Sequence, residues 1–294
     1  MAGAEQFAGP IGNTVSISTG RYAAILGAAP SKGARSPLLW NAAFRAAGID
    51  AVMHPMDVTA ENLPAVVAAL KADPRFVGGA VAVPHKQALV QLLDRVEPEA
   101  ASIGAVNAIY RENGELVGAN TDGAGALSQI EELVGGGHAL QTRRALVLGL
   151  GGAGLSVAAF LAGRVTELTV ANRTRATADA VAARLGVMVA DWPVGADVLS
   201  KIDLLVNATS IGHRDGPAGS PVAERDLAVL PGSAAVYDVV YQPDVTPLLA
   251  MAAARGLEVR NGLGMNLDQA VIAFGKAMPG LLGRDAVRAA MRTA

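Results

Sequence analysis

Three glycines, Gly149, Gly151 and Gly154, stand where an apolar run ends and an alanine-rich segment begins. The run at 144–149 predicts a strand, and the segment at 153–162 predicts a helix. A G-x-G-x-x-G turn between strand and helix lets the backbone approach a pyrophosphate, which then lies against the free N–H groups of the helix N-terminus. The spacing predicts a dinucleotide site, and the alternative is a glycine turn in some other α/β fold.

The residues after the next apolar run indicate which dinucleotide binds. In NAD sites an acidic residue about 20 positions beyond the glycines holds the ribose 2′-hydroxyl. Here the run at 167–171 is followed by Asn172, Arg173, Thr174 and Arg175. Two arginines and two polar side chains suit a 2′-phosphate, so we expect NADP(H); an ordinary basic loop is the alternative.

Polar residues outside the glycine turn form a second set of candidates. Lys86 follows one apolar segment, Asn107 lies within another, and Asp122 precedes the part of the chain that carries the glycine turn. Taken singly, they are also explained as a surface lysine, a hairpin residue and a helix cap. Asn207 ends the run at 203–207, at the edge where open α/β sheets bind ligands. The four histidines have no metal-ligand spacing, and we expect no metal site.

The elements that must position these residues alternate along the N-terminal part. Apolar runs predict helices at 37–47 and 62–72 and strands at 22–27, 51–56, 79–83, 106–110 and 115–119. Ser36 is expected as the N-cap of the first helix, and Pro84 as the opening residue of a helix after the third strand. Asn113-Gly114 predicts the hairpin turn between the last two strands.

From about Thr121 the pattern becomes a series of βαβ units. Strands are predicted at 144–149, 167–171, 203–207 and 234–239, with a further short one at 257–259. Helices fill most of the gaps, which indicates an α/β fold with a parallel, doubly wound sheet of the Rossmann type. The tail is predicted to form helices at 265–280 and 285–293.

Composition narrows the class of protein. The 294 residues are 51% hydrophobic and 17% charged, which supports a sizeable core and argues against disorder. The net charge of −2, without a basic block, makes nucleic acid an unexpected partner. No apolar run reaches the roughly 18 residues of a membrane span, and the N-terminus lacks the features of a signal peptide. The absence of cysteine excludes disulfides and cysteine nucleophiles and fits a cytoplasmic location.

The motifs occur in an order that is more specific than any one of them. Around the glycine turn stand Val83-Pro84-His85-Lys86, Gly104-Ala105-Val106-Asn107, Asn120-Thr121-Asp122-Gly123, Asn172-Arg173-Thr174, Asn207-Ala208-Thr209-Ser210, Tyr237-Asp238-Val239-Val240-Tyr241, Asn261-Gly262-Leu263-Gly264-Met265 and Gln269. In this order, from about Tyr22 to Gly280, they resemble the shikimate dehydrogenase family.

The resemblance implies a two-domain α/β enzyme. Residues 1–120 with 263–294 would form the substrate-binding catalytic domain, and residues 121–262 the NADP-binding Rossmann domain. The family reduces 3-dehydroshikimate to shikimate with NADPH, or runs the reverse oxidation, in aromatic amino acid biosynthesis. The partner would be a small hydroxy-carboxylic acid, without nucleic acid or membrane, and the enzyme would be a monomer or a homodimer.

The resemblance also carries binding roles onto individual residues. Asn107 and Gln269 would bind ring hydroxyls of the substrate. Ser36 and Tyr241 would hold the substrate near its carboxylate. The cofactor would contact Gly149, Leu150, Gly151, Gly152, Ala153, Asn172, Arg173, Thr174, Arg175, Val239 and Gly262.

Lys86 and Asp122 would be the catalytic pair, and ketone reduction explains why those residue types suit the task. Negative charge develops on the carbonyl oxygen as hydride arrives, and an ammonium group beside that oxygen stabilises the charge and delivers a proton. A free lysine has a pKa of about 10.4, so burial must offset the effect of the carboxylate if Lys86 is to exchange protons near neutrality. Asp122 would orient the amine and bind a neighbouring hydroxyl.

The substrate half departs from the family pattern. The family usually has Ser-x-Ser-Pro before the first helix, and here the first serine is Ala34. Ser31, Lys32 or Arg35 could compensate. The family's Asn-Val-Thr-Val-Pro is Ala80-Val81-Ala82-Val83-Pro84 in this chain. The alternative substrates are therefore quinate, an aminoshikimate or another cyclic hydroxy acid.

A protein of a different class, a nucleotide sensor that has lost turnover, is a further alternative. Binding alone does not require an acid–base pair, so the presence of both Lys86 and Asp122 favours an enzyme. A methylenetetrahydrofolate-type dehydrogenase has a similar two-domain plan, but the Asn120-Thr121-Asp122-Gly123 motif fits it poorly.

Overall fold

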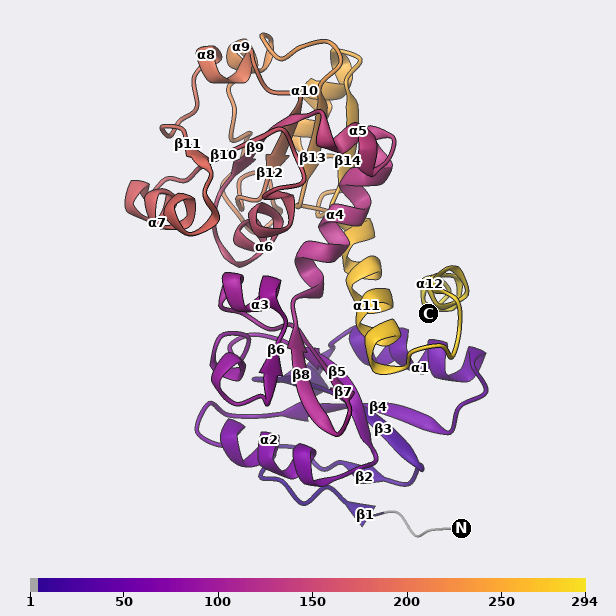
Figure 1. The fold of residues 1–294 in the computed structure, drawn as a ribbon. Coiled ribbons are helices and arrows are strands. Elements are labelled where there is room, and N and C mark those ends of the chain that lie inside the picture. The colour runs from indigo at the N-terminus through magenta and orange to yellow at the C-terminus, as the bar shows by residue number, and fades with distance from the viewer. Residues whose placement is uncertain (1–4) are drawn as a thin grey trace. The chain divides into compact units, whose positions relative to one another are not determined.

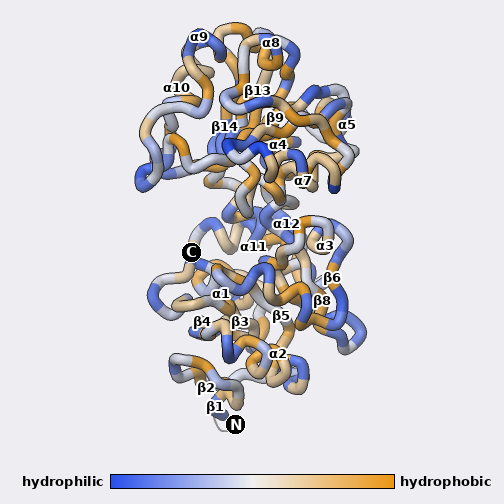
Figure 2. The backbone as a smooth tube through the Cα atoms, turned by 90° about the vertical axis from the view of Figure 1, so that its left-hand side faces the viewer, coloured by the Kyte–Doolittle hydropathy of each residue, from blue (hydrophilic) through white to orange (hydrophobic). Residues whose placement is uncertain are grey.

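The computed structural model describes residues 5–294, which divide into two compact units. The first unit takes the chain up to Thr121 together with Gln269–Ala294, and the second comprises Asp122–Asp268. The second boundary falls within α11 (Leu263–Ala277). Each unit has its own sheet, and hydrophobic segments lie inside each unit while hydrophilic ones gather in outer loops (Figure 1, Figure 2).

The first unit is built on a mixed six-stranded sheet in the order β4-β3-β5-β7-β8-β6. Its strands are β3 (Arg21–Gly27), β4 (Ala51–Asp57), β5 (Phe76–Val81), β6 (Arg95–Val96), β7 (Ala108–Glu112) and β8 (Glu115–Ala119). Strands β3, β4 and β5 are parallel, whereas β7 runs antiparallel to both β5 and β8. A separate antiparallel pair consists of β1 (Glu5–Gln6) and β2 (Ser16–Ile17).

Helices cover both faces of this sheet, and Figure 1 shows α1 (Ser36–Ala46) and α2 (Leu63–Ala72) on opposite sides. The α2 side buries Val66 and Leu70 in one apolar cluster with strand residues. On the α1 side, Trp40 and Phe44 pack against Phe274 of α11, with ring centroids 5.3 and 5.2 Å from its ring. The remaining helices of the unit are η1 (Pro30–Lys32), η2 (Ala88–Gln91), α3 (Pro98–Ile103) and α12 (Arg284–Arg292).

The second unit has a fully parallel six-stranded sheet in the order β11-β10-β9-β12-β13-β14, which confirms the Rossmann-type prediction. Its strands are β9 (Arg144–Leu148), β10 (Glu167–Ala171), β11 (Met188–Val189), β12 (Leu204–Asn207), β13 (Ala235–Asp238) and β14 (Glu258–Asn261). The ends of the predicted strands differ from these by at most two residues. The apolar runs located these strands except the two-residue β11, because both faces of such a sheet are buried.

Alternation along β9 explains how the second sheet is covered on both sides. Ala145 and Val147 belong to the cluster packed by α4, α6 and α7, whereas Leu146 and Leu148 belong to the cluster packed by α8, α9 and α10. The helices are α4 (Thr121–Val134), α5 (Gly137–Gln141), α6 (Gly152–Leu161), α7 (Arg175–Leu185), α8 (Ala196–Leu199), α9 (Glu224–Leu227) and α10 (Pro247–Ala254). Among residues 5–294, none of the helices has the length and apolar character that a membrane span requires.

Two local predictions in the first unit are wrong. Ser36 is the first residue of α1, and the N-cap is Arg35, whose side chain makes no capping hydrogen bond. Pro84 does not open a helix, because residues 83–87 form a turn and the next helical element is η2. In that turn the Lys86 carbonyl accepts a hydrogen bond from the distant Val106 N–H. In a helix it would instead accept one from the residue four positions later. By contrast, the predicted hairpin is confirmed, with Asn113 at φ 52° and Gly114 at φ 88°.

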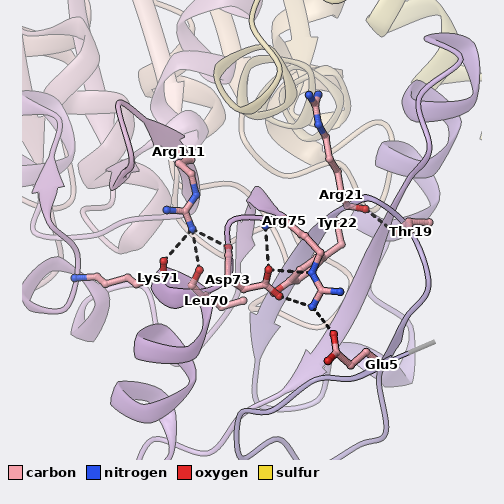
Figure 3. A network of polar contacts seen from close by, with 9 residues as sticks. All are labelled: Glu5, Thr19, Arg21, Tyr22, Leu70, Lys71, Asp73, Arg75 and Arg111. Carbon is pink, nitrogen blue, oxygen red and sulfur yellow. Dashed lines mark hydrogen bonds and ion pairs between the residues drawn. The ribbon is translucent and has the colours of Figure 1, made fainter. Parts of the chain in front are cut away.

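Arg111 of β7 ties the sheet to the end of α2 (Figure 3). Its guanidinium donates to the carbonyls of Phe76 at 3.0 Å, Gly114 at 2.8 Å, Leu70 at 2.9 Å and Asp73 at 3.1 Å. The last carbonyls of a helix have no partner within the helix, so the end of α2 needs such donors. The planar fork of five N–H groups lets one side chain satisfy all these acceptors.

Arg111→Lys is expected to lower the free energy of unfolding by about 1–3 kcal/mol, because an ammonium group cannot reach all these carbonyls together. Chemical denaturation followed by circular dichroism measures the loss. Arg21→Lys is the matched control, since the Arg21 side chain is exposed and makes no hydrogen bond with any of residues 5–294. An equal effect of the two substitutions would contradict the role given to Arg111.

Candidate active site

The first candidate site lies at the turn between β9 and α6. The Gly149 N–H donates to the Ala171 carbonyl at 2.8 Å, which ties the turn to the end of β10. Gly149 has a φ of +86°, and a Cβ there would lie 2.8 Å from the Thr209 methyl group. Both the backbone conformation and the space therefore require glycine at this position.

The other glycines leave the space that a phosphate needs. Gly151 and Gly152 are exposed, and a Cβ on either would meet no atom within 4 Å. Gly154 is buried in α6, where a Cβ would lie 1.9 Å from the Gly149 carbonyl oxygen. The helix therefore starts very close to the strand end, with its free N–H groups facing open space. These residues fit the pyrophosphate of a dinucleotide.

Asn172 joins the glycine turn to the loop that follows β10. Its side-chain oxygen accepts a hydrogen bond from the Leu150 N–H at 3.1 Å. Its side-chain amide donates to the Thr174 carbonyl at 3.1 Å. The loop expected to select the cofactor is thereby held beside the turn expected to bind its phosphates.

The two arginines of this loop differ in their contacts. Arg175, the first residue of α7, donates to Asp179 at 2.7 Å and also forms an ion pair with Asp191. Arg173 is exposed, and its guanidinium makes no hydrogen bond or ion pair with any of residues 5–294. Arg173 therefore differs from Arg175 in having no partner within residues 5–294, a distinction that the sequence pattern does not make.

Val239 and Gly262, both expected at the cofactor, lie against each other at the ends of β13 and β14. A Cβ on Gly262 would lie 2.0 Å from the Val239 carbonyl oxygen. The Val239 N–H donates to the carbonyl of Asn207, which ends β12, at 2.8 Å. Three neighbouring parallel strands thus end together, at the edge where α/β sheets bind ligands.

Asp238, a residue that the sequence analysis did not single out, holds this edge together. Its carboxylate accepts hydrogen bonds from Asn207 Nδ2 at 2.9 Å, the Val240 N–H at 3.0 Å and the Thr246 hydroxyl at 2.6 Å. Burial raises the pKa of Asp238 to about 6, although the three donors oppose this rise. Nothing in the local pattern indicates that a carboxylate at this strand end is fully buried.

The second candidate site lies on the first unit, around Lys86. The preceding residue, His85, is buried, and its Nε2 donates to the Val58 carbonyl at 2.8 Å. The Val106 N–H donates to the Lys86 carbonyl at 2.7 Å. The turn is therefore anchored to two distant segments, and Lys86 lies half-buried beside Val106, the residue that precedes Asn107. His85 therefore has a structural role.

Asn107 and Gln269, both expected to bind ring hydroxyls, are brought together by Thr121. The Thr121 N–H donates to Asn107 Oδ1 at 2.6 Å, and Asn107 Nδ2 donates to the Thr121 hydroxyl oxygen at 3.1 Å. That hydroxyl in turn donates to Gln269 Oε1 at 3.4 Å. The Asn120-Thr121-Asp122 motif contains Thr121, but no sequence signal indicates that its side chain bridges residues so far apart.

The other expected residues are placed on separate elements. Asp122 lies half-buried in the first turn of α4, and Tyr241 follows Val240; both belong to the second unit. Ser36 begins α1 on the first unit, and its hydroxyl makes no hydrogen bond with any of residues 5–294. Within the same range, no group of three or more His, Asp or Glu residues could hold a metal ion.

Comparisons with known proteins find similarity along most of the chain. A profile described as shikimate dehydrogenase substrate binding domain matches residues 26–109, and one described as shikimate/quinate 5-dehydrogenase matches residues 131–214. A protein from Citrifermentans bemidjiense named shikimate dehydrogenase (NADP(+)) is 46% identical over 252 residues. That alignment covers 81% of this chain and 83% of the relative.

Solved structures share the fold over nearly the whole chain. Shikimate 5-dehydrogenase from Thermus thermophilus, in complex with NADP(H) and shikimate, has a TM-score of 0.76 and 34% identity, covering 93% of this chain and 99% of its own. The ligand-free 5-ketofructose reductase of Gluconobacter sp. strain CHM43 has a TM-score of 0.78 and 29% identity, covering 94% and 99%. Enzymes named for different substrates therefore have this fold.

Asp238→Asn is expected to remove one pH dependence of stability. Since the folded-state pKa is raised from 3.8 to about 6, the native protein binds this proton more tightly than the unfolded chain does. The stability that Asp238 contributes is therefore fully present below about pH 4 and is lost as the pH rises through about 6. A rise of this size corresponds to roughly 3 kcal/mol.

Urea denaturation of the wild type and of Asp238→Asn, each at about pH 4 and about pH 7.5, measures this effect. The free energy of unfolding of the variant minus that of the wild type should be larger at the higher pH than at the lower one. A difference between the two proteins that does not change with pH would show that the pKa of Asp238 is not raised.

Proposed function

The chain belongs to the shikimate dehydrogenase family, and we propose that it interconverts 3-dehydroshikimate and shikimate with NADP(H). The observation that carries the proposal is the 46% identity, across 81% of the chain, to a relative named shikimate dehydrogenase (NADP(+)). The alternatives of quinate, an aminoshikimate or another hydroxy acid are less well supported, because relatives at this level of identity bear the shikimate name. A nucleotide sensor without turnover is disfavoured for the same reason.

The second unit would hold the cofactor, which when bound supplies or accepts the hydride. Gly149 to Ala153 would receive the pyrophosphate at the N-terminus of α6. Asn172 to Thr174 would hold the 2′-phosphate, with Arg173 as its main cation and Arg175 shaping the loop through its ion pairs. Val239 and Gly262 would contact the cofactor at the ends of β13 and β14.

Lys86 would supply the proton in ketone reduction. As the carbonyl carbon accepts hydride its oxygen becomes an alkoxide, and the Lys86 ammonium would stabilise that charge and transfer a proton from Nζ. In the reverse direction the neutral amine would accept the hydroxyl proton. Asp122 would orient the amine and accept a hydrogen bond from a neighbouring hydroxyl. The anchoring of the turn through His85 and Val106 supports this role, because it limits where Nζ can go.

The substrate would bind to the first unit through its ring hydroxyls. Asn107 and Gln269 would contact them, and the bonds to Thr121 support this role because they restrict both amide groups. Ser36 and Tyr241 would lie near the carboxylate. Residues 1–120 with 263–294 would then be the substrate-binding domain and residues 121–262 the cofactor domain.

The proposed setting is the cytoplasm, in the biosynthesis of aromatic amino acids. The cysteine-free chain fits a reducing compartment. The enzyme would act as a monomer or homodimer on small acids, and neither nucleic acid nor a membrane would take part.

Lys86→Ala is expected to lower kcat by roughly a hundred- to ten-thousandfold, because it removes the general acid–base group. The dissociation constant for NADP⁺ should stay near that of the wild type. Steady-state oxidation of shikimate and fluorescence titration of the cofactor measure the two quantities. Lys201→Ala, at an exposed lysine, is the control. Unchanged turnover in Lys86→Ala would remove this residue from the mechanism.

Arg173→Ala is expected to raise the KM for NADP⁺ by roughly tenfold to a hundredfold, because a charge-assisted contact to phosphate is lost. The KM for NAD⁺ should change little, since that cofactor has no 2′-phosphate. Arg184→Ala tests whether removing any exposed arginine of α7 has the same effect. Equal increases for both cofactors would mean that the phosphate-binding residue is misassigned.

A further inference from the structure

A pocket of about 330 Å³ lies on the first unit, at the carboxyl ends of β3 and β5. It is bordered by Gly27 at the end of β3, by η1 and the turn after it, and by Ala82 and Val83. A Cβ on Gly27 would lie 3.0 Å from the Cβ of Ala82, so the two segments are in contact. The carboxyl ends of parallel strands are where α/β sheets bind ligands.

Lys32 is the one charged residue among those that line this pocket. The others are glycine, alanine, proline and valine, and they include Ala34 and Ala82. Those two alanines stand where the family pattern has a serine and a threonine. The pocket has therefore lost two hydroxyl groups, and a cation stands at its edge.

Ser31 is not available to replace the missing serine. Its N–H and its hydroxyl both donate to the Asp57 carboxylate, at 2.9 and 2.5 Å, and it does not line the pocket. Arg35 does not line the pocket either, because it lies beyond the turn as the N-cap of α1. Of the three residues that could compensate for Ala34, Lys32 is therefore the one that lines the pocket.

The turn that carries Lys32 is held by its own hydrogen bonds. The Lys32 N–H donates to the Ala29 carbonyl at 3.1 Å, and the Ala34 N–H donates to the Pro30 carbonyl at 3.0 Å. Gly33 has a φ of +132°, a conformation that only glycine adopts readily, and it ends η1 directly after the lysine. The Lys32 ammonium is exposed and forms no ion pair within residues 5–294, so its charge is available to a ligand.

We infer that Lys32 binds the carboxylate of the substrate, in place of the serine hydroxyl that Ala34 lacks. The inference rests on the proposed function and names a specificity-determining residue for it. A bond from an ammonium to a carboxylate is roughly twice as strong as a neutral hydrogen bond, so one lysine offsets the loss of hydroxyl donors. Within this pocket the negative charge of the ligand is sensed by Lys32, because the remaining lining residues are glycine, alanine, proline and valine.

Kinetics with shikimate, and inhibition by its uncharged methyl ester, test this inference. Lys32→Met should raise the KM for shikimate by roughly tenfold to a hundredfold with kcat largely unchanged. The inhibition constant of the ester should stay near the wild-type value. The variant therefore loses the preference for the acid over the ester. Lys32→Arg should keep most of that preference, and Arg35→Met, the matched control, should keep all of it. The affinity for NADP⁺ reports that each variant is folded.

An undiminished preference for the acid in Lys32→Met would overturn the inference, and so would an equal loss in Arg35→Met. Normal oxidation of shikimate by the wild type, together with either of these results, would contradict only the role of Lys32. A wild-type protein that does not turn over shikimate would instead contradict the proposed function and this inference with it.

Discussion

The second unit depends on how closely α6 approaches the end of β9. A Cβ on Gly154 would fall 1.9 Å from the Gly149 carbonyl oxygen, so a side chain at that position would push the helix away from the sheet. At this short distance the first turn of α6 begins directly beyond the strand, with Gly151 and Gly152 exposed. The free N–H groups of the helix can then converge on an anion, which is what a phosphate site requires.

Buried polar groups hold the strand ends in register around this turn. Asp238 accepts three hydrogen bonds, from Asn207 at the end of β12, from Val240 just after β13 and from Thr246, the N-cap of α10. Such a carboxylate loses hydration on folding, and its raised pKa shows that the donors do not fully offset that cost. These hydrogen bonds fix where the segment at 239–241 leaves the sheet. The ends of the strands are thereby held in place, although burying the carboxylate lowers the stability of the fold.

The first unit uses other polar groups for a comparable purpose. His85 reaches the Val58 carbonyl, and Thr121 bridges Asn107 and Gln269. Each of these contacts links a short segment that carries polar side chains to a residue far away in the sequence. A loop alone would leave these side chains free to move, whereas a buried hydrogen bond to a second element costs free energy when broken and so restricts them.

Local pattern predicts an element well when the element is long and its own residues determine it. The strands of the second unit other than β11 and the Asn113-Gly114 hairpin are of this kind, because buried faces and turn conformations impose residue types directly. Elements such as β6 (Arg95–Val96) and the turn at 83–87 were missed or misassigned. Their few residues are held by partners elsewhere in the chain, so no local signal marks them.

The sequence by itself determined the family, the Rossmann-type sheet and the preference expected for NADP(H), because ordered motifs and apolar periodicity depend only on residue type and spacing. Only the tertiary structure decided which similar residues are available for binding. Asp179 and Asp191 engage Arg175 and leave Arg173 open, while Asp57 engages Ser31 and leaves Lys32 at the pocket. The physical reason is that a side chain's availability depends on partners brought near it by folding, and most of these lie far away along the chain.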